Sequence, residues 1–94
     1  MLRIEALEIT DEILDKLASK HGVSMDEVEE LCFSEGLHAR GGRDGLLMLF
    51  GQTDAGRYLL VVLAPRSNEG VWAVVTARDM TLQERRLYKK QRGK

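Results

Sequence analysis

The chain has little cysteine, proline or aromatic residue content, and almost no net charge. One cysteine among 94 residues excludes an internal disulfide and suits a reducing, cytoplasmic environment. No apolar run approaches the roughly 20 residues that cross a bilayer, and the first residues lack the apolar core of a signal peptide. With 44% hydrophobic and 31% charged residues, the sequence predicts a single globular domain over residues 1–94.

Metal and nucleotide sites also lack the residues that they need. The two histidines, His21 and His38, and the single cysteine show no spacing typical of zinc ligands. The glycines at 41, 42 and 45 fit neither nucleotide-binding fingerprint. The sequence therefore predicts no metal and no cofactor. Cys32 falls on the apolar stripe of a predicted helix, so we expect a buried core thiol rather than a nucleophile.

The net charge of −1 conceals a gradient along the chain. Residues 1–35 contain ten acids and three bases, whereas residues 78–94 contain seven bases and two acids. Such a basic end suits a polyanion such as RNA or an acidic partner protein. A solvated helical face explains the same charges, so charge alone does not decide between these interpretations.

Two helices are predicted in the acidic half. Thr10 is a suitable N-cap for a helix over about residues 11–20, with acids in its first turn. Ser24 and Glu27 have the spacing of a capping box, which predicts the start of a second helix. We expect that helix to end near residues 33–36.

The middle of the chain predicts a sheet. Apolar runs at 46–52, 57–64 and 71–77 indicate three strands joined by turns at 53–56 and 65–70. Short connections make consecutive strands antiparallel, so the prediction is an α+β fold with a three- to four-stranded meander sheet. A short edge strand around residues 2–7 and a glycine-rich, irregular or short-strand segment over 36–45 complete this region.

The predicted strands are apolar at successive positions, so both faces of the sheet need cover. The two N-terminal helices can cover one face. A C-terminal helix, capped by Thr81 and Glu84, covers part of the other with a thin apolar stripe of Leu82 and Leu87. We expect some apolar sheet surface to remain for a partner or a second copy of the chain. Residues 91–94 are expected to form a disordered basic tail.

Three segments, in the same order, resemble the BrnT family of toxin–antitoxin ribonucleases, which have a RelE-like fold. They are Lys20 to Ser24 before the acidic helix, Gly51 to Arg57 in the central hairpin, and Thr76 to Thr81 with Glu84, Arg85 and Tyr88. The resemblance covers roughly residues 15–90. It implies a cytoplasmic toxin that cleaves RNA without a metal and is silenced by a ribbon–helix–helix antitoxin.

Metal-free RNA cleavage requires help for the attacking 2′-hydroxyl, stabilisation of charge on the phosphate and protonation of the leaving oxygen. Arg57 and Arg78 are candidates to hold the phosphate, because a guanidinium offers a bidentate fork. His21 is a candidate acid or base, because histidine is the residue type most often used for proton transfer near neutral pH. Glu84 and Tyr88 are candidates to assist from the last helix.

Each of these residues except Arg78 also has a local structural explanation. His21 precedes a C-capping glycine, and Arg57 can shield a hairpin end. Glu84 belongs to a capping box, and Tyr88 can pack its ring on the sheet. Arg78 is therefore the strongest catalytic candidate, since no local role explains an arginine between a strand and a helix.

The sequence also supports a second function. BrnT-family members commonly begin with a Trp-Asp pair, whereas this chain has Glu8 to Glu12 in that region, without tryptophan. This departure and the near-zero net charge favour, as the alternative, a non-catalytic module of the same fold that binds a small partner protein.

Overall fold

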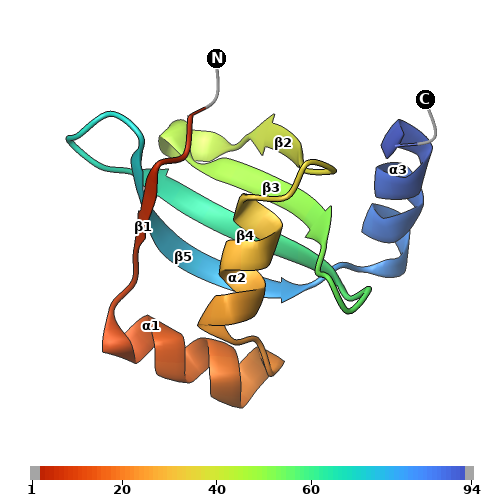
Figure 1. Ribbon diagram of the computed structural model, residues 1–94, viewed down its shortest axis with the longest axis horizontal. Coiled ribbons are helices and arrows are strands. Elements are labelled where there is room, and N and C mark those ends of the chain that lie inside the picture. The colour runs from red at the N-terminus through yellow and green to blue at the C-terminus, as the bar shows by residue number, and fades with distance from the viewer. Residues whose placement is uncertain (1–2, 93–94) are drawn as a thin grey trace.

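The computed structural model describes residues 3–92 and shows an α+β fold built on one five-stranded sheet (Figure 1). The strand order is β1-β5-β4-β3-β2. The strands are β1 (Ala6–Glu8), β2 (His38–Gly41), β3 (Leu47–Gln52), β4 (Tyr58–Pro65) and β5 (Val71–Asp79). Strands β2 to β5 form the predicted antiparallel meander, and β1 adds a parallel strand beside β5.

Strand β1 begins later than the sequence predicted, because only residues 6–8 pair with β5. Residue 2 of the expected edge strand lies outside the described residues. The segment after the second helix does contain a short strand, β2, which is followed by a 3₁₀ turn, η2 (Arg43–Gly45).

The capping signals in the sequence mark the observed helix starts. Helix α1 (Asp11–Lys16) begins after Thr10, whose hydroxyl accepts from the amide of Ile13 at 3.2 Å. It continues as a π-helical turn, η1 (Leu17–His21), rather than as the α-helix that we expected there. Helix α2 (Met25–Cys32) begins with the complete capping box of Ser24 and Glu27. Helix α3 (Leu82–Arg92) has the same device, with Thr81 and Glu84 bonded in both directions.

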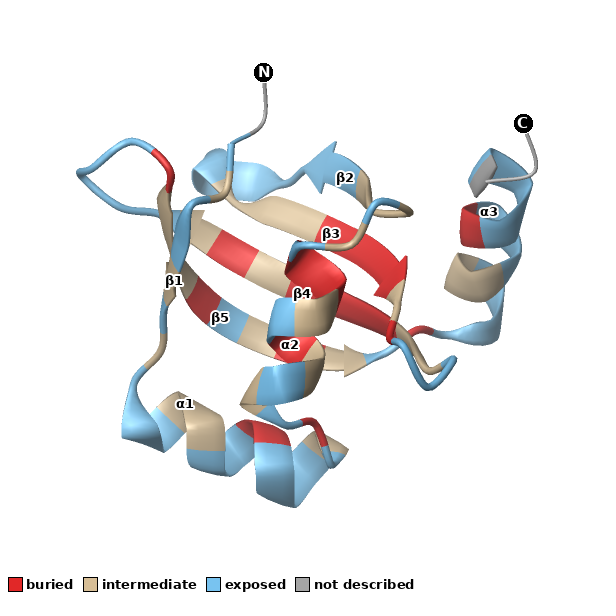
Figure 2. Cartoon of the chain, viewed as in Figure 1, coloured by how far each residue is buried: buried red, intermediate tan, exposed pale blue. Residues whose placement is uncertain are grey.

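Helices α1 and α2 pack on one side of the sheet, here called the helix-covered face, and α3 packs against one end of the opposite side, here called the open face (Figure 1). Buried residues concentrate where α2 crosses β3 and β4 (Figure 2). The main core on the helix-covered face contains Leu17, Val23, Val28, Leu31, Cys32, Leu49, Leu59, Val61, Leu63, Val74 and Ala77. A smaller cluster on the open face contains Phe50, Leu60, Met80 and Tyr88.

Cys32 is part of the main core, as the sequence predicted. The residue is 4% exposed, and burial raises the pKa of its thiol to about 12. A thiol with that pKa is protonated at neutral pH, so Cys32 is a packing residue and not a nucleophile.

The open face is only partly covered by α3. Met48, Tyr58 and Val62 pack around the small cluster there but are half-buried. This confirms the expectation that the two helical layers leave apolar sheet surface accessible.

The prediction that Leu82 and Leu87 form the buried stripe of the last helix was wrong. Leu82 and Leu87 are 62% and 48% exposed, whereas Tyr88 is 3% exposed. The ring of Tyr88 meets that of Tyr58 edge-on, with ring centres 6.0 Å apart, and its hydroxyl donates to the carbonyl of Gly36 at 2.9 Å. The helix crosses one end of the sheet, and Tyr88 rather than either leucine joins the buried cluster of the open face. Residues 91 and 92 of the expected tail are helical, and residues 93–94 lie outside the described residues.

Strand β5 is longer than predicted and contains a β-bulge. Val74 pairs with Leu63 and Thr76 pairs with Val62, which leaves Val75 as the extra residue. The strand continues to Asp79 because β4 is long enough to pair with it. Arg78 therefore lies within a strand and not in a strand-to-helix junction.

Within residues 3–92, no helix is both long enough and apolar enough to cross a membrane.

Candidate functional site

The five sequence-predicted residues separate into two groups at the end of β5. Consecutive residues of a strand face opposite sides of its sheet. Arg78 pairs with Leu60 and lies on the open face, whereas Asp79 pairs with Leu59 and lies on the helix-covered face. Glu84 contacts Arg78, but Arg57 contacts Asp79. The two arginines that we expected to act together are therefore on opposite sides of the sheet.

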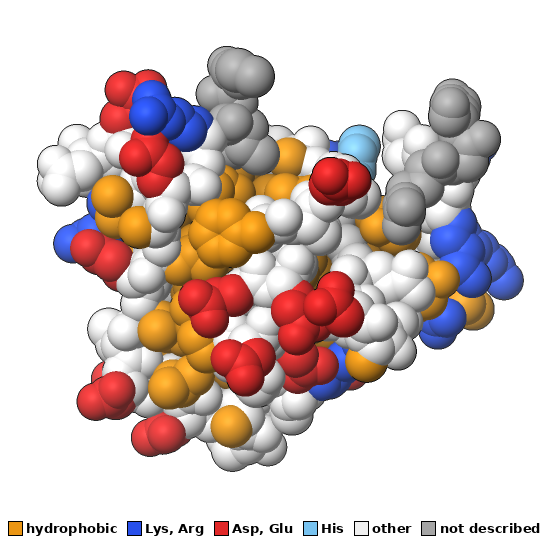
Figure 3. All heavy atoms as spheres, viewed as in Figure 1, with side chains coloured by type: hydrophobic (Ala, Val, Ile, Leu, Met, Phe, Trp, Pro, Cys, Tyr) orange, Lys and Arg blue, Asp and Glu red, His pale blue; other side chains and the backbone are white. Residues whose placement is uncertain are grey.

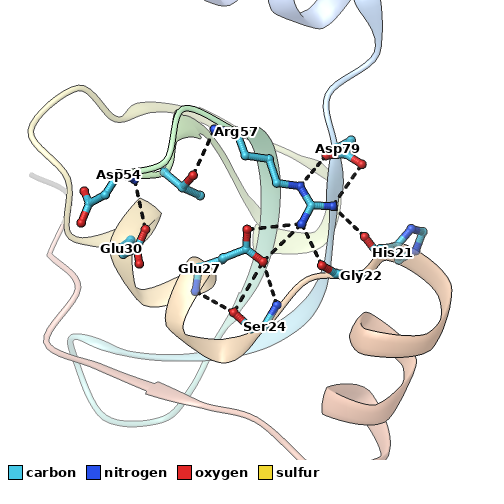
Figure 4. Close-up of polar contacts among 9 residues, drawn as sticks. His21, Gly22, Ser24, Glu27, Glu30, Asp54, Arg57 and Asp79 are labelled. Carbon is cyan, nitrogen blue, oxygen red and sulfur yellow. Dashed lines mark hydrogen bonds and ion pairs between the residues drawn. The ribbon is translucent and has the colours of Figure 1, made fainter.

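Arg57 is the centre of a polar cluster that joins four parts of the chain (Figure 4). Its Nε and Nη2 donate to the carboxylate of Asp79 at 2.8 and 3.2 Å. Nη1 donates to the carbonyl of Gly22 at 2.7 Å and to Glu27 at 3.2 Å. Nη2 also donates to the carbonyl of His21 at 2.7 Å. These contacts fix the β3–β4 hairpin to η1, to the start of α2 and to the end of β5.

The donors of Arg57 are fully used within this cluster. A guanidinium has five N–H groups, and each one has a partner in the contacts with Asp79, Glu27, Gly22 and His21. Hydrogen bonds from Arg57 also hold the pKa of Asp79 below its ordinary value. Binding a phosphate through Arg57 would require breaking these contacts, so its observed role is structural.

Arg78 is held in place by Glu84 but keeps free donors. Nη1 and Nη2 donate to the two carboxylate oxygens of Glu84 at 2.8 and 3.0 Å, and Nη1 also donates to the carbonyl of Asp79 at 3.0 Å. Among residues 3–92, Nε and one N–H of Nη2 have no partner. The side chain is 36% exposed. Arg78 thus combines a fixed orientation with two donors available to a ligand.

Glu84 serves Arg78 and the start of α3 simultaneously. Its Oε1 accepts from the amide of Thr81 at 2.8 Å as well as from Arg78. The hydrogen bonds from Arg78 are the main reason why the pKa of Glu84 lies below its ordinary value. A carboxylate stabilised in this way is a poor proton acceptor, so Glu84 is a positioning residue for Arg78 rather than a general base.

Glu84→Gln is expected to reduce the sensitivity of the fold to acid. A carboxyl whose pKa is lower in the folded state adds stability above its unfolded pKa of about 4.3, and this stability is lost as the pH falls through the folded value. Thermal unfolding between pH 7 and pH 3 should therefore show a steeper decline for the wild type than for Glu84→Gln, which retains a capping side chain. Glu35→Gln, an exposed site, is the matched control and should follow the wild type. Equal slopes for Glu84→Gln and wild type would contradict the ion pair.

Tyr88 and His21 have different surroundings. The hydroxyl of Tyr88 donates to Gly36 and its ring is buried, which matches the packing role considered from the sequence. The carbonyl of His21 accepts from Arg57, but its side chain lines a hollow of about 480 Å³ between α1, η1 and β5. Lys16 and Lys20 line the same hollow. His21 thus remains accessible to a ligand, whereas Tyr88 is almost fully enclosed.

Sequence reasoning missed a groove between α3 and strands β2 and β3 on the open face. Its volume is about 300 Å³. The lining residues are His38, Arg40, Met48, Phe50, Glu84, Leu87, Tyr88 and Gln91. The detectable signal was the alternation of His38, Ala39 and Arg40, which in a strand places the first and third side chains on one face. We considered His38 only as a zinc ligand. Among residues 3–92, no group of three His, Cys, Asp or Glu side chains is arranged to hold a metal.

The charge gradient of the sequence becomes a spatial division. Acidic side chains gather over α1 and α2, and basic side chains lie over α3 (Figure 3). Arg85 and Lys89 of α3 lie 4.5 and 5.2 Å from the centre of the Tyr58 ring, within the range of cation–π contact. The open face beside α3 is thus flanked by positive charge.

The structure is similar to the crystal structure of the Brucella abortus ribonuclease toxin BrnT, with a TM-score of 0.67. The match covers 81% of this chain and 96% of that chain at 15% sequence identity. The chain has a BrnT-like fold. The resemblance drawn from three short segments is therefore confirmed at the level of the fold. No protein-family profile matches the chain, and no curated protein matches it in sequence.

Proposed function

We propose that this protein is a BrnT-like toxin: a cytoplasmic endoribonuclease that cleaves RNA without a metal and is inhibited by a ribbon–helix–helix antitoxin. The BrnT-like fold supports this proposal, since the similar structure is that of a ribonuclease toxin. The observation that carries it is the state of Arg78. This arginine lies on the open face, is held by Glu84, and keeps two N–H donors for a phosphate.

In this proposal the candidates predicted from the sequence have more specific roles. Arg78 contacts the scissile phosphate and stabilises the charge that develops on it as the 2′-hydroxyl attacks. Glu84 positions Arg78, while Arg57 and Tyr88 hold the scaffold together. Proton transfer falls to His38, which lies on the open face in the same row as Arg78, whereas His21 lies with Arg57 on the helix-covered side. Cleavage rates against pH for His38→Gln, compared with His21→Gln, test this assignment.

The proposal predicts a growth phenotype. Induction of the wild-type chain in a bacterium should stop growth and degrade RNA, and Arg78→Ala should restore growth, with cleavage reduced at least about tenfold because the phosphate loses its bidentate contact. Arg86→Ala is the matched control, because Arg86 is exposed on α3 and makes none of the contacts of Arg78. Circular dichroism checks that both variants fold. A folded wild type that neither arrests growth nor cleaves RNA would overturn the proposal.

The alternative is a non-catalytic module that binds a small partner protein. It is favoured by the half-buried apolar side chains of Met48, Tyr58 and Val62 on the open face. This alternative predicts a stable complex with a small protein encoded beside it and no RNA degradation by the purified chain. Light scattering on the isolated chain distinguishes this complex from a homodimer formed through the same surface.

A further inference from the structure

We infer that the groove between α3 and strands β2 and β3 binds one nucleobase of the RNA strand whose phosphate contacts Arg78. This inference rests on the proposed function and adds to it the means by which a cleavage site would be chosen. Glu84 connects the two parts, because it holds Arg78 and also forms a wall of the groove.

The register of the sheet places the groove beside Arg78. On the open face, His38 pairs with Phe50, Phe50 with Leu60, and Leu60 with Arg78, so these four residues form one row across the sheet. Three strand spacings of about 4.8 Å separate the ends of the row by roughly 14 Å. The groove occupies the His38 half of this row. An RNA chain whose phosphate contacts Arg78 can therefore place a neighbouring base in the groove.

The lining of the groove suits the two chemical surfaces of a base. Met48 and Leu87 offer apolar walls for the faces of the ring. Arg40 and Gln91 offer polar groups for its edge. Bases in single-stranded RNA are commonly held in this way, with their faces against side chains and their edges hydrogen-bonded. Arg40 only donates, which favours a base with two adjacent acceptors on one edge, namely O6 and N7 of guanine or O2 and N3 of cytosine.

The size of the groove favours a small occupant. A volume of about 300 Å³ lies at the lower end of the range for ligand pockets. A helix of a partner protein places several anchoring side chains along a longer groove. The positive charge of Arg40 in the groove lining complements the RNA backbone rather than an apolar helix.

The first test blocks the groove. Leu87→Trp fills it, and Leu82→Trp adds the same bulk to an exposed site on the same helix that does not line it. We expect Leu87→Trp to weaken binding of a fluorescent single-stranded RNA oligonucleotide about tenfold in anisotropy titrations, and Leu82→Trp to leave binding unchanged. Thermal unfolding checks that both variants fold.

The second test reads base preference with smaller changes that also serve if the tryptophan variant does not fold. Gln91→Ala and Arg40→Ala should reduce the cleavage preference among the four bases about fivefold. Gln83→Ala and Arg43→Ala, at exposed sites outside the groove, should retain it. Sequencing of the cleavage products of a mixed-sequence RNA measures this preference.

The outcomes separate the two proposals. A wild type that binds and cleaves RNA, together with groove variants of unchanged affinity and preference, would overturn the inference alone. Loss of binding to a small partner protein in Leu87→Trp, with RNA binding intact, would also overturn it and assign the groove to that protein. A wild type that neither binds nor cleaves RNA would overturn both the inference and the proposed function.

Discussion

Leu31→Ala is expected to lower the free energy of unfolding by about 3 kcal/mol. Leu31 is fully buried and lies where α2 crosses the sheet, directly against the backbone of Gly51 in β3. The substitution removes buried apolar surface and leaves a cavity, because helix and strand are each fixed by other contacts. Urea denaturation measures the change. Phe33→Ala is the control, since Phe33 is 53% exposed just after the same helix, and we expect an effect of less than about 0.5 kcal/mol there.

A double mutant tests the same contact from the other side. A Cβ atom on Gly51 would lie 2.9 Å from Cγ of Leu31, so Gly51→Ala is expected to cost about 1–2 kcal/mol through overpacking. In the double mutant the new methyl group occupies space vacated by Leu31. The combined loss should then be smaller than the sum of the single losses. Strict additivity would contradict the close packing of α2 on β3.

Arg57→Ala should lower the free energy of unfolding by about 2–3 kcal/mol, even though Arg57 is a charged residue near the surface. The substitution removes every side-chain hydrogen bond of Arg57 at once and leaves the carbonyls of His21 and Gly22 without this donor. Arg57→Lys should recover only part of the loss, because an ammonium cannot reproduce the planar fork. Urea denaturation again provides the measurement.

Arg66→Ala is the matched control for Arg57. Arg66 pairs with Glu8 at 3.0 Å, but both side chains are 56% exposed, and such pairs contribute less than about 1 kcal/mol. If Arg57→Ala retained wild-type stability but lost RNA cleavage, Arg57 would be catalytic, as its sequence motif first suggested. The RNA cleavage rate of each variant must therefore be divided by the concentration of folded protein before the variants are compared.

Local signals in the sequence were sufficient to predict most of the elements. Capping residues such as Thr10 and Ser24 act within one turn, and apolar runs such as residues 57–64 define strands without knowledge of their neighbours. The observed helix starts follow these signals closely. The BrnT-like fold could also be predicted, since the three short segments that resemble the BrnT family occur in the same order along this chain.

The site was harder to predict from the sequence, because its contacts join distant parts of the chain. Arg57 is bonded to residues 22 to 36 positions away, and no local pattern identifies such partners. The groove lined by His38 was not predicted, because it forms between a short edge strand and a helix that lies more than 40 residues further along the chain. The exposed Leu87 was assigned to a buried stripe because helical spacing does not reveal how little of a helix touches the sheet.

The bulge at Val75 shifts the alternation of side chains between the two faces of β5 by one residue. Counted in steps of two from the buried Val74, the strand would turn Thr76 and Arg78 toward the acidic helices and Asp79 toward the opposite side. The unpaired Val75 resets the count, so that Ala77 is buried with Val74 and Arg78 emerges on the open face. Losing Val75 would therefore leave the outward direction of Arg78 intact, because Val74, Thr76, Ala77 and Arg78 would then alternate regularly while keeping their partners on β4.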